Sequence, residues 1–251
     1  MCVGGLLLYL LMTVQDQRDI SLRFRRFVRR YEPIHARAIN KALRTQVNQY
    51  IEKGTLMAVN STPIYPVMVE LYKTAAKIWA HQSALQIRRH KGRQPLGFSE
   101  RIVELMRKYY GIDLLNVAEG LTQTTKDQIQ AVLSEAAEKG WSFDEIVSRL
   151  QVPELTSVRA RLIARTETVS AANGAATINA KETGLQLNKI WIAAIDSRTR
   201  PDHLIVNGQI IGVDDYFIVG GYKMSQPGDR THGADSSEIC NCRCTVAFIP
   251  I

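Results

Sequence analysis

The sequence contains little cysteine, and its cysteines are unevenly placed. Four occur in 251 residues, and Cys240, Cys242 and Cys244 alternate near the carboxy terminus. Secreted proteins that depend on disulfides spread their cysteines along the chain to join distant loops. The pattern therefore excludes a secreted disulfide framework and indicates synthesis in a reducing cytoplasm.

Long hydrophobic segments are also lacking. The apolar run at residues 3–14 resembles a targeting segment, but it is shorter than the ~20 residues that cross a bilayer, and no Lys or Arg precedes it. We expect translation to start at Met12, which would leave residues 1–11 outside the protein; the alternative is an anchoring segment. The sequence has no internal repeat or low-complexity tract, and it predicts a folded protein without a membrane partner.

The excess of basic residues is confined to the amino-terminal part. Residues 1–94 contain sixteen Lys and Arg and five Asp and Glu, so this part carries +11 and the remainder −3 of the total charge of +8. Such a region attracts DNA, RNA or acidic protein surfaces. A solvated helix surface has the same composition, so both interpretations stay open. The candidate contact residues are Arg23, Arg25, Arg26, Arg29, Arg30, Arg88, Arg89, Lys91 and Arg93.

Helical periodicity dominates the first 120 residues. Apolar residues from Ile20 to Tyr31 recur at helical spacing, and Pro33 is expected to end this helix or to start the next, which stops at Gly54. A third helix is expected over residues 67–85, followed by an exposed basic hinge at 88–97. A fourth helix over residues 98–110 leads into a looser segment up to residue 120.

Between residues 122 and 150 the sequence predicts a helical hairpin. Thr125 with Gln128, and Ser142 with Glu145, have the spacing of capping boxes, and Gly140 separates the two helices. A long helix over residues 155–183 follows, with Leu162 and Ile163 expected to be buried and with small residues in its second half. Asn173 and Gly174 lower helix propensity there, so we expect packing to hold that half in place.

Short apolar runs separated by turns follow residue 184. They predict strands over residues 189–195, 204–206, 210–213, 216–219 and 244–249, with a hairpin turn at Asn207-Gly208. The predicted fold class is α+β: a helical, basic amino-terminal region, a helical hairpin, a long helix and a small antiparallel β-sheet. We expect two domains, at residues 1–120 and 121–251.

Several motifs in the second half follow one order and spacing. They are Ala-Arg-Thr-Glu-Thr at 164–168, Trp191, Asp-Ser-Arg-Thr-Arg-Pro-Asp-His at 196–203, Asn207-Gly208, Phe217, Pro-Gly-Asp at 227–229 and Asn-Cys-Arg-Cys at 241–244. This ordered set resembles the phage Mu F-like head morphogenesis family over roughly residues 122–251. No single motif identifies the family, whereas the ordered set of motifs does. Cys240, directly before the last motif, departs from the family pattern.

The resemblance implies a minor head protein of a tailed phage, which is a virion component rather than an enzyme. It implies a place in the head interior or at the portal vertex, after assembly in the host cytoplasm, and a role in head assembly and DNA packaging or delivery. The implied partners are the portal protein, other capsid proteins and packaged double-stranded DNA, with several copies around the portal. Two alternatives stay open: a metal-dependent nuclease or other hydrolase that uses His203 and the carboxy-terminal cysteines, and a stand-alone DNA-binding module.

A structural zinc ion is a candidate cofactor, because thiols and imidazoles are its usual ligands and a tetrahedral site needs four. His203, His232, Cys242 and Cys244 supply that number. Residues i and i+2 of an extended strand point to the same face, so the two cysteines could meet at one ion. Structural zinc sites more often place two residues between their cysteines, so the alternative is that these cysteines are small buried residues.

A hydrolase would also need a cluster of carboxylates or a histidine with an orienting partner. The Asp residues at 196, 202, 214, 215 and 229 lie in turn-rich segments, where Asp usually bonds to the local backbone. We therefore predict no catalytic constellation.

The family motifs are expected to have structural roles. Arg165 and Glu167 lie two apart on one helix and face different directions, and we expect one of them to pair with the loop at residues 196–200. Trp191 and Phe217 are expected in the core of that junction. The residues assigned to this structural motif are Arg165, Glu167, Trp191, Asp196, Arg200, His203, Asn241, Cys242, Arg243 and Cys244.

Overall fold

The computed structural model describes residues 12–91 and 98–251, and it confirms the α+β class. Within this part of the chain the helices are α1 (Val14–Lys53), α2 (Tyr65–Lys91), α3 (Phe98–Lys139), α4 (Phe143–Leu150), α5 (Arg159–Glu182), α6 (Pro201–Ile205) and α7 (Ser236–Ile239). The strands are β1 (Leu187–Ile192), β2 (Ile210–Gly212), β3 (Phe217–Val219), β4 (Tyr222–Met224) and β5 (Thr245–Pro250). A short 3-10 turn, Leu56–Ala58, follows α1, and a π-helical turn, Glu154–Val158, precedes α5.

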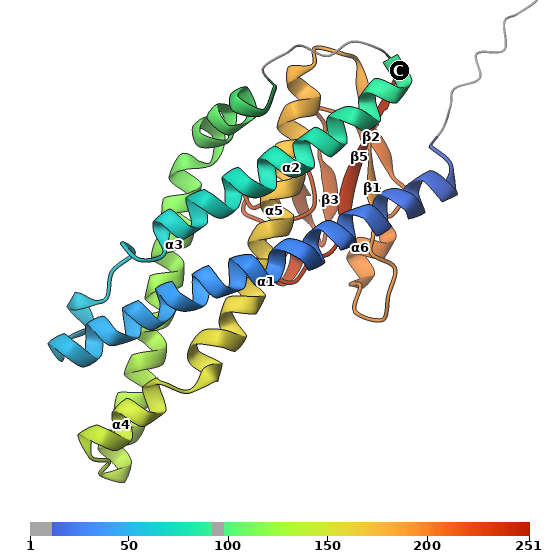
Figure 1. Cartoon of the computed structure of the whole chain (residues 1–251). Coiled ribbons are helices and arrows are strands. Elements are labelled where there is room, and N and C mark those ends of the chain that lie inside the picture. The colour runs from blue at the N-terminus through green and yellow to red at the C-terminus, as the bar shows by residue number, and fades with distance from the viewer. Residues whose placement is uncertain (1–11, 92–97) are drawn as a thin grey trace, which may run out of the picture.

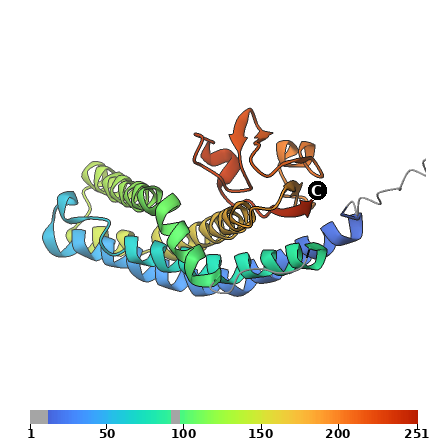
Figure 2. The same cartoon turned by 90° about the horizontal axis from the view of Figure 1, so that it is seen from above.

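Helix α5 lies at the centre of the molecule (Figure 1). Seen from above, α1 and α2 lie along one side of it, and the carboxy-terminal strands and loops lie on the other (Figure 2). Antiparallel strands in the order β2-β1-β5 form one sheet, and β3 and β4 form a separate hairpin. The helix α5 therefore carries contacts from the helical layer to the sheet.

Helix α1 runs unbroken past Pro33, so the expected interruption there is wrong. A proline inside a helix removes one backbone hydrogen bond and costs ~3 kcal/mol or more in isolation. Buried residues occur on both sides of it, including Val28 and Ile39, and α1 packs along α5 and α2. This packing offsets the local cost, and Gly54 ends the helix in a left-handed conformation, as expected.

Helix α3 is also continuous, which corrects the expected loose segment before residue 120 and the capping box at Thr125. Thr125 lies inside the helix, where its hydroxyl accepts a hydrogen bond from Arg159 at 2.8 Å. Buried Leu114, Ala118 and Ile129 keep the helix packed across the region where a break was expected. The capping box of Ser142 and Glu145 is confirmed at the start of α4. The expected domain boundary after residue 120 falls within α3, and a two-domain division stays a prediction.

Two expectations for the second half need correction. Residues 204–206 were expected to form a strand, but Pro201 starts the short helix α6, because proline at the first position of a helix is already in a helical conformation. The expected hairpin turn between two strands at Asn207-Gly208 is therefore wrong, because these residues connect α6 to β2. In α5, Ile163 is buried as expected, whereas Leu162 is 45% exposed because it lies on the outer side of the helix.

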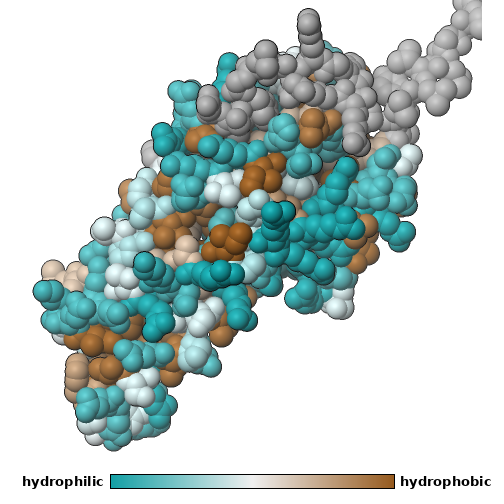
Figure 3. All heavy atoms as spheres, in the orientation of Figure 1, coloured by the Kyte–Doolittle hydropathy of each residue, from teal (hydrophilic) through white to brown (hydrophobic). Residues whose placement is uncertain are grey.

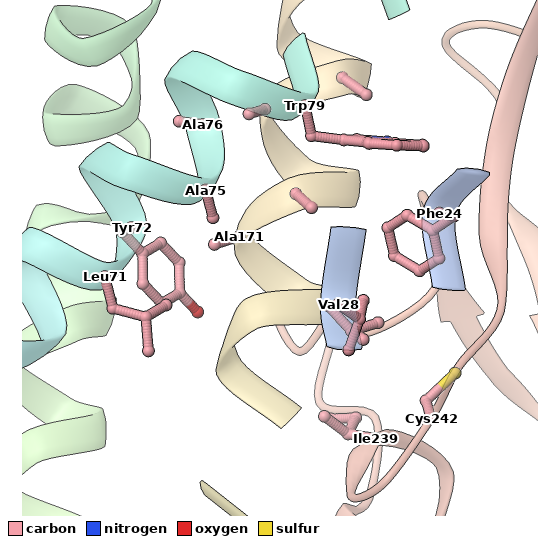
Figure 4. Packing of buried hydrophobic residues seen from close by; sticks show 14 of the residues in the cluster. Phe24, Val28, Leu71, Tyr72, Ala75, Ala76, Trp79, Ala171, Ile239 and Cys242 are labelled. Carbon is pink, nitrogen blue, oxygen red and sulfur yellow. The ribbon is translucent and has the colours of Figure 1, made fainter. Parts of the chain in front are cut away.

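Small residues of α5 allow neighbouring helices to approach closely. Figure 4 shows Ala171 of α5 beside Ala75 of α2 within the buried core, which also includes Phe24 and Val28 of α1 and Cys242. On the α3 side, a Cβ atom at Gly174 would lie 2.3 Å from Oη of Tyr110. Only glycine at residue 174 leaves room for the Tyr110 side chain.

Gly174→Ala is expected to destabilise the fold by about 1–3 kcal/mol, since the added methyl group overpacks a filled contact. Its gain in helix propensity, ~1 kcal/mol, offsets only part of this. Chemical unfolding of the variant measures the loss. In a Tyr110→Leu background the same substitution should be neutral or stabilising, and an equal loss in both backgrounds would contradict the steric explanation.

The contact between α1 and α5 contains a buried histidine. His35 Nδ1 lies 2.8 Å from Oγ1 of Thr168, and burial lowers the pKa of His35 from 6.5 to about 4. The unfolded chain therefore binds a proton at a higher pH than the folded protein. Stability contributed by neutral His35 is present above pH 6.5 and is lost as the pH falls towards 4.

Between about pH 7.5 and about pH 5, His35→Gln is expected to remove about 2 kcal/mol of the acid-induced loss of stability. Guanidinium unfolding of both proteins, at about pH 7.5 and about pH 5, gives the difference. The carboxylates are common to both chains and cancel in the comparison. An identical pH dependence in the two proteins would contradict the assigned role of His35.

The basic residues of α1 lie mainly at the surface. Arg23, Arg26, Arg29 and Arg30 are exposed and Arg25 is half-buried, whereas Phe24 and Phe27 are in the core, as expected. The face that carries α1 and α2 is largely hydrophilic, with scattered hydrophobic residues (Figure 3). Arg88, Arg89 and Lys91 lie in the last turn of α2, while Arg93 and the rest of the expected hinge, residues 92–97, fall outside the described residues. In residues 12–91 and 98–251 no helix has the length and apolar character that a membrane span requires.

Candidate functional site

One cluster of metal-ligand side chains lies between α6 and the segment that leads into β5. The ligand atoms of His203, Cys242 and Cys244 all lie within 4.8 Å of one another. Nδ1 of His203 is 3.4 Å from Sγ of Cys244 and 3.6 Å from Sγ of Cys242. The three residues are only 1%, 3% and 2% exposed, in the order His203, Cys242, Cys244. The geometry therefore fits a closed site rather than an open cleft.

A carboxylate and an aromatic ring hold the histidine in place. Nε2 of His203 lies 3.0 Å from Oε2 of Glu238 in α7, and the ring of Trp191 meets it edge-on at 5.4 Å between centroids. With the carboxylate accepting at Nε2, Nε2 carries the hydrogen and the Nδ1 lone pair faces the two sulfur atoms. Glu238 was not among the residues proposed from the sequence, because nothing in the chain order links it to His203.

The two thiols differ in acidity because they hydrogen-bond to each other. The Cys242 thiol donates to Cys244, and this bond together with His203 lowers the pKa of Cys244 well below its usual value. The same bond and burial raise the pKa of Cys242. Cys244 is therefore the sulfur that carries negative charge most readily.

His232 does not join this cluster, so the expected set of four ligands is wrong. Its ring lies 4.5 Å from that of Tyr216, and its Nδ1 is 2.9 Å from the hydroxyl of Thr231. Asp229 fixes this segment by accepting hydrogen bonds from the backbone N–H groups of Ser225 and Thr231. The loop is thereby folded on itself, away from His203.

Arg165 and Glu167 do face different directions, but neither pairs with the loop at residues 196–200. Arg165 forms a bidentate ion pair with Glu32 of α1, at 2.7 and 2.9 Å, and also contacts Asn241. Glu167 is 5% exposed and accepts hydrogen bonds from Tyr72 of α2 and Arg230. The expected pairing was wrong because α1 and α2, not the loop, cover these faces of α5.

The loop at residues 196–200 is instead joined to the cysteine segment. Arg243 forms a bidentate ion pair with Asp196, and Arg200 donates a hydrogen bond to the main-chain oxygen of Cys240 at 2.6 Å. The family motifs at 196–203 and 241–244 therefore contact each other directly. Trp191 and Phe217 are buried beside them with ring centroids 5.3 Å apart, which confirms their expected core position.

The candidate carboxylates do not gather at one place. Asp215 accepts from the backbone of Gly212, Asp214 pairs with Lys181, and Asp196 pairs with Arg243. Among the described residues, His203, Cys242 and Cys244 form the one group of at least three possible ligands. The contacts of these carboxylates are those of residues that fix loops.

Asn173 is a central residue that the sequence did not reveal. Its fully buried amide donates to the main-chain oxygens of Pro227 and Cys244, and its oxygen accepts from the Thr245 hydroxyl and the Val246 N–H. A neighbouring close contact explains the Pro-Gly-Asp motif, since a Cβ at Gly228 would lie 3.0 Å from the backbone of Ser170. The second half of α5 is thus joined to β5 and to the 227–229 turn.

The comparisons with known proteins match the same region. The model of the family described as phage Mu protein F like protein matches residues 127–247. The minor head protein GP7 of Bacillus phage SPP1 is 29% identical over 164 residues, which are 61% of this chain and 52% of GP7. No solved structure matches the chain.

Two further relatives carry different names. The NAD(+)–arginine ADP-ribosyltransferase EFV of Enterococcus faecalis is 36% identical over 111 residues, which are 43% of this chain and 22% of that protein. The uncharacterized protein YqbB of Bacillus subtilis is 27% identical over 134 residues, which are 52% of this chain and 44% of YqbB. This chain therefore spans about half, or less, of each of these relatives.

The matched residues include α5, β1 to β4, the start of β5 and the cluster around His203. Residues 127–247 of this chain are therefore similar to the phage Mu protein F like family.

Proposed function

We propose that this protein is a minor structural component of a tailed-phage head. The observation that carries the proposal is the family match over residues 127–247, together with the similarity to a protein named as a minor head protein. We place it in the head interior or at the portal vertex, after assembly in the host cytoplasm. There it would bind the portal and other capsid proteins, in several copies, and act in head assembly and in DNA packaging or delivery.

The contacts of the candidate site favour binding over turnover. His203, Cys242 and Cys244 are almost fully buried, so a substrate has no direct access to them. The nearby carboxylates hold backbone or arginine partners. The similarity to the transferase covers only 22% of that protein, which is too small a share to assign its activity to this chain.

A second surface supports contact with DNA or with an acidic protein face. A groove of about 570 Å³ between α1 and the start of α5 is lined by Arg29, Arg37, Arg161 and Arg165, with Glu32 beside them. Arg165 forms an ion pair with Glu32, which leaves the other three arginines as candidate phosphate or carboxylate contacts.

Binding to duplex DNA should weaken steeply with added salt. Replacing Arg29, Arg37 and Arg161 with Ala should reduce that salt dependence, whereas absent or salt-insensitive binding would leave portal or capsid contacts as the role of the groove.

Mass spectrometry of density-purified virions tests the main proposal. We expect peptides of this chain in DNA-filled particles at low copy, and fewer infectious particles when its gene carries a nonsense mutation. A chain that is absent from particles but needed for growth would contradict a structural role.

A further inference from the structure

The ligand atoms around His203 have the spacing of a tetrahedral metal site. Zinc binds sulfur at ~2.3 Å and nitrogen at ~2.0 Å, which at a tetrahedral angle separates the two donors by about 3.5 Å. The distances from His203 Nδ1 to the sulfurs of Cys244 and Cys242 are 3.4 and 3.6 Å. The two nitrogen-to-sulfur distances therefore fit a single tetrahedral ion bound by all three side chains.

Both sulfurs lie within 3.6 Å of Nδ1 of His203, which has one lone pair. In the metal-free protein one thiol would donate to Nδ1 and the other to its neighbouring sulfur. A metal ion would satisfy both sulfurs and the nitrogen together.

The surroundings of the cluster are those that support metal ligands. Glu238 accepts from Nε2 of His203 at 3.0 Å, and metal-binding histidines commonly donate their second N–H to a carboxylate in this way. Burial of all three ligands excludes competing solvent.

We propose that His203, Cys242 and Cys244 bind a structural zinc ion that joins α6 to the start of β5. The three side chains supply three of the four ligands that a tetrahedral site needs. Glu238 is a positioning residue that acts through His203. The ion would stabilise the contact between the two family motifs at 196–203 and 241–244, independently of whether the protein is part of a phage head.

Metal analysis of the full-length protein, purified under reducing conditions, tests this site. We expect elemental mass spectrometry to find about one zinc ion per chain. Replacement by cobalt should give thiolate-to-metal charge-transfer bands and the visible bands of a tetrahedral ion. Wild-type protein that contains no zinc and gives no cobalt spectrum would overturn the proposal, and this measurement does not depend on the folding of any variant.

Matched variants identify the ligands. Cys242→Ser with Cys244→Ser should abolish binding, whereas Cys240→Ser and His232→Ala should each retain about one ion per chain. Glu238→Gln should weaken zinc affinity by roughly 10- to 100-fold in a chelator competition while keeping the cobalt spectrum. Zinc retained by the double cysteine variant, or lost from either control, would overturn the assigned ligand set.

Discussion

Asn173→Ala is expected to have the largest effect of the substitutions considered for this fold, a loss of roughly 3–5 kcal/mol in the free energy of unfolding. The reason is that one buried amide makes four hydrogen bonds, to Pro227, Cys244, Thr245 and Val246. Alanine would leave two carbonyls, one hydroxyl and one N–H buried without these partners. Equilibrium unfolding in denaturant, followed by circular dichroism, measures the loss.

The same helix provides a matched control in Asn179. This residue is also buried, at 1% exposure, but its amide makes no hydrogen bond to the part of the chain that the structure describes. Asn179→Ala removes the same atoms and should change stability by less than about 1 kcal/mol, because alanine also favours the helix. If the two substitutions cost the same, the hydrogen bonds of Asn173 do not hold the junction between α5 and β5.

Arg230→Met should destabilise the protein by about 3 kcal/mol, because it leaves the charge of Glu167 buried without its counter-ion. The expected loss is at the lower end for a buried pair, since the Arg230 side chain remains 25% exposed. Removing both charges, with Glu167→Gln in the same chain, should recover much of this stability. Tyr72 could still hydrogen-bond to the new amide.

An exposed ion pair gives the control for Arg230. Arg101 pairs with Glu182 at 3.0 Å, but the two side chains are 72% and 30% exposed. Arg101→Met should therefore cost no more than about 1 kcal/mol. Comparable losses from the two arginine substitutions would contradict the special role given to the buried carboxylate of Glu167.

Local signals predicted the parts of this fold that depend on a few neighbouring residues. The capping box at Ser142 and the stop at Gly54 need only a side chain and the adjacent backbone, so the sequence identified both. The same spacing at Thr125 was misleading, because a capping box forms only where a helix begins, and α3 continues through that residue. The helix continues there because this part of α3 packs against α1 and α5. Such contacts between distant segments cannot be recognised from a local sequence pattern.

The candidate site could be predicted only in part, for a similar reason. The alternation of Cys242 and Cys244 and the family motifs identified three of the clustered residues. Partners that are distant along the chain were missed, including Glu32 for Arg165, which is 133 residues away, and Glu238 for His203. A single sequence records which residues can pair but not which faces meet, and this explains both the missed partners and the incorrect assignment of His232.

We infer that α5, together with the direct contacts of α1 and α2 with β5, joins the amino-terminal helices and the carboxy-terminal sheet into one folding unit. Hydrogen exchange of the whole chain, with and without Asn173→Ala, tests it most directly. We predict that the slowest amides of α1, α2, α5 and β5 exchange with the same free energy of opening, and that the substitution lowers all of them together. Slow exchange retained in α1 and α2 while β5 opens separately would contradict the claim.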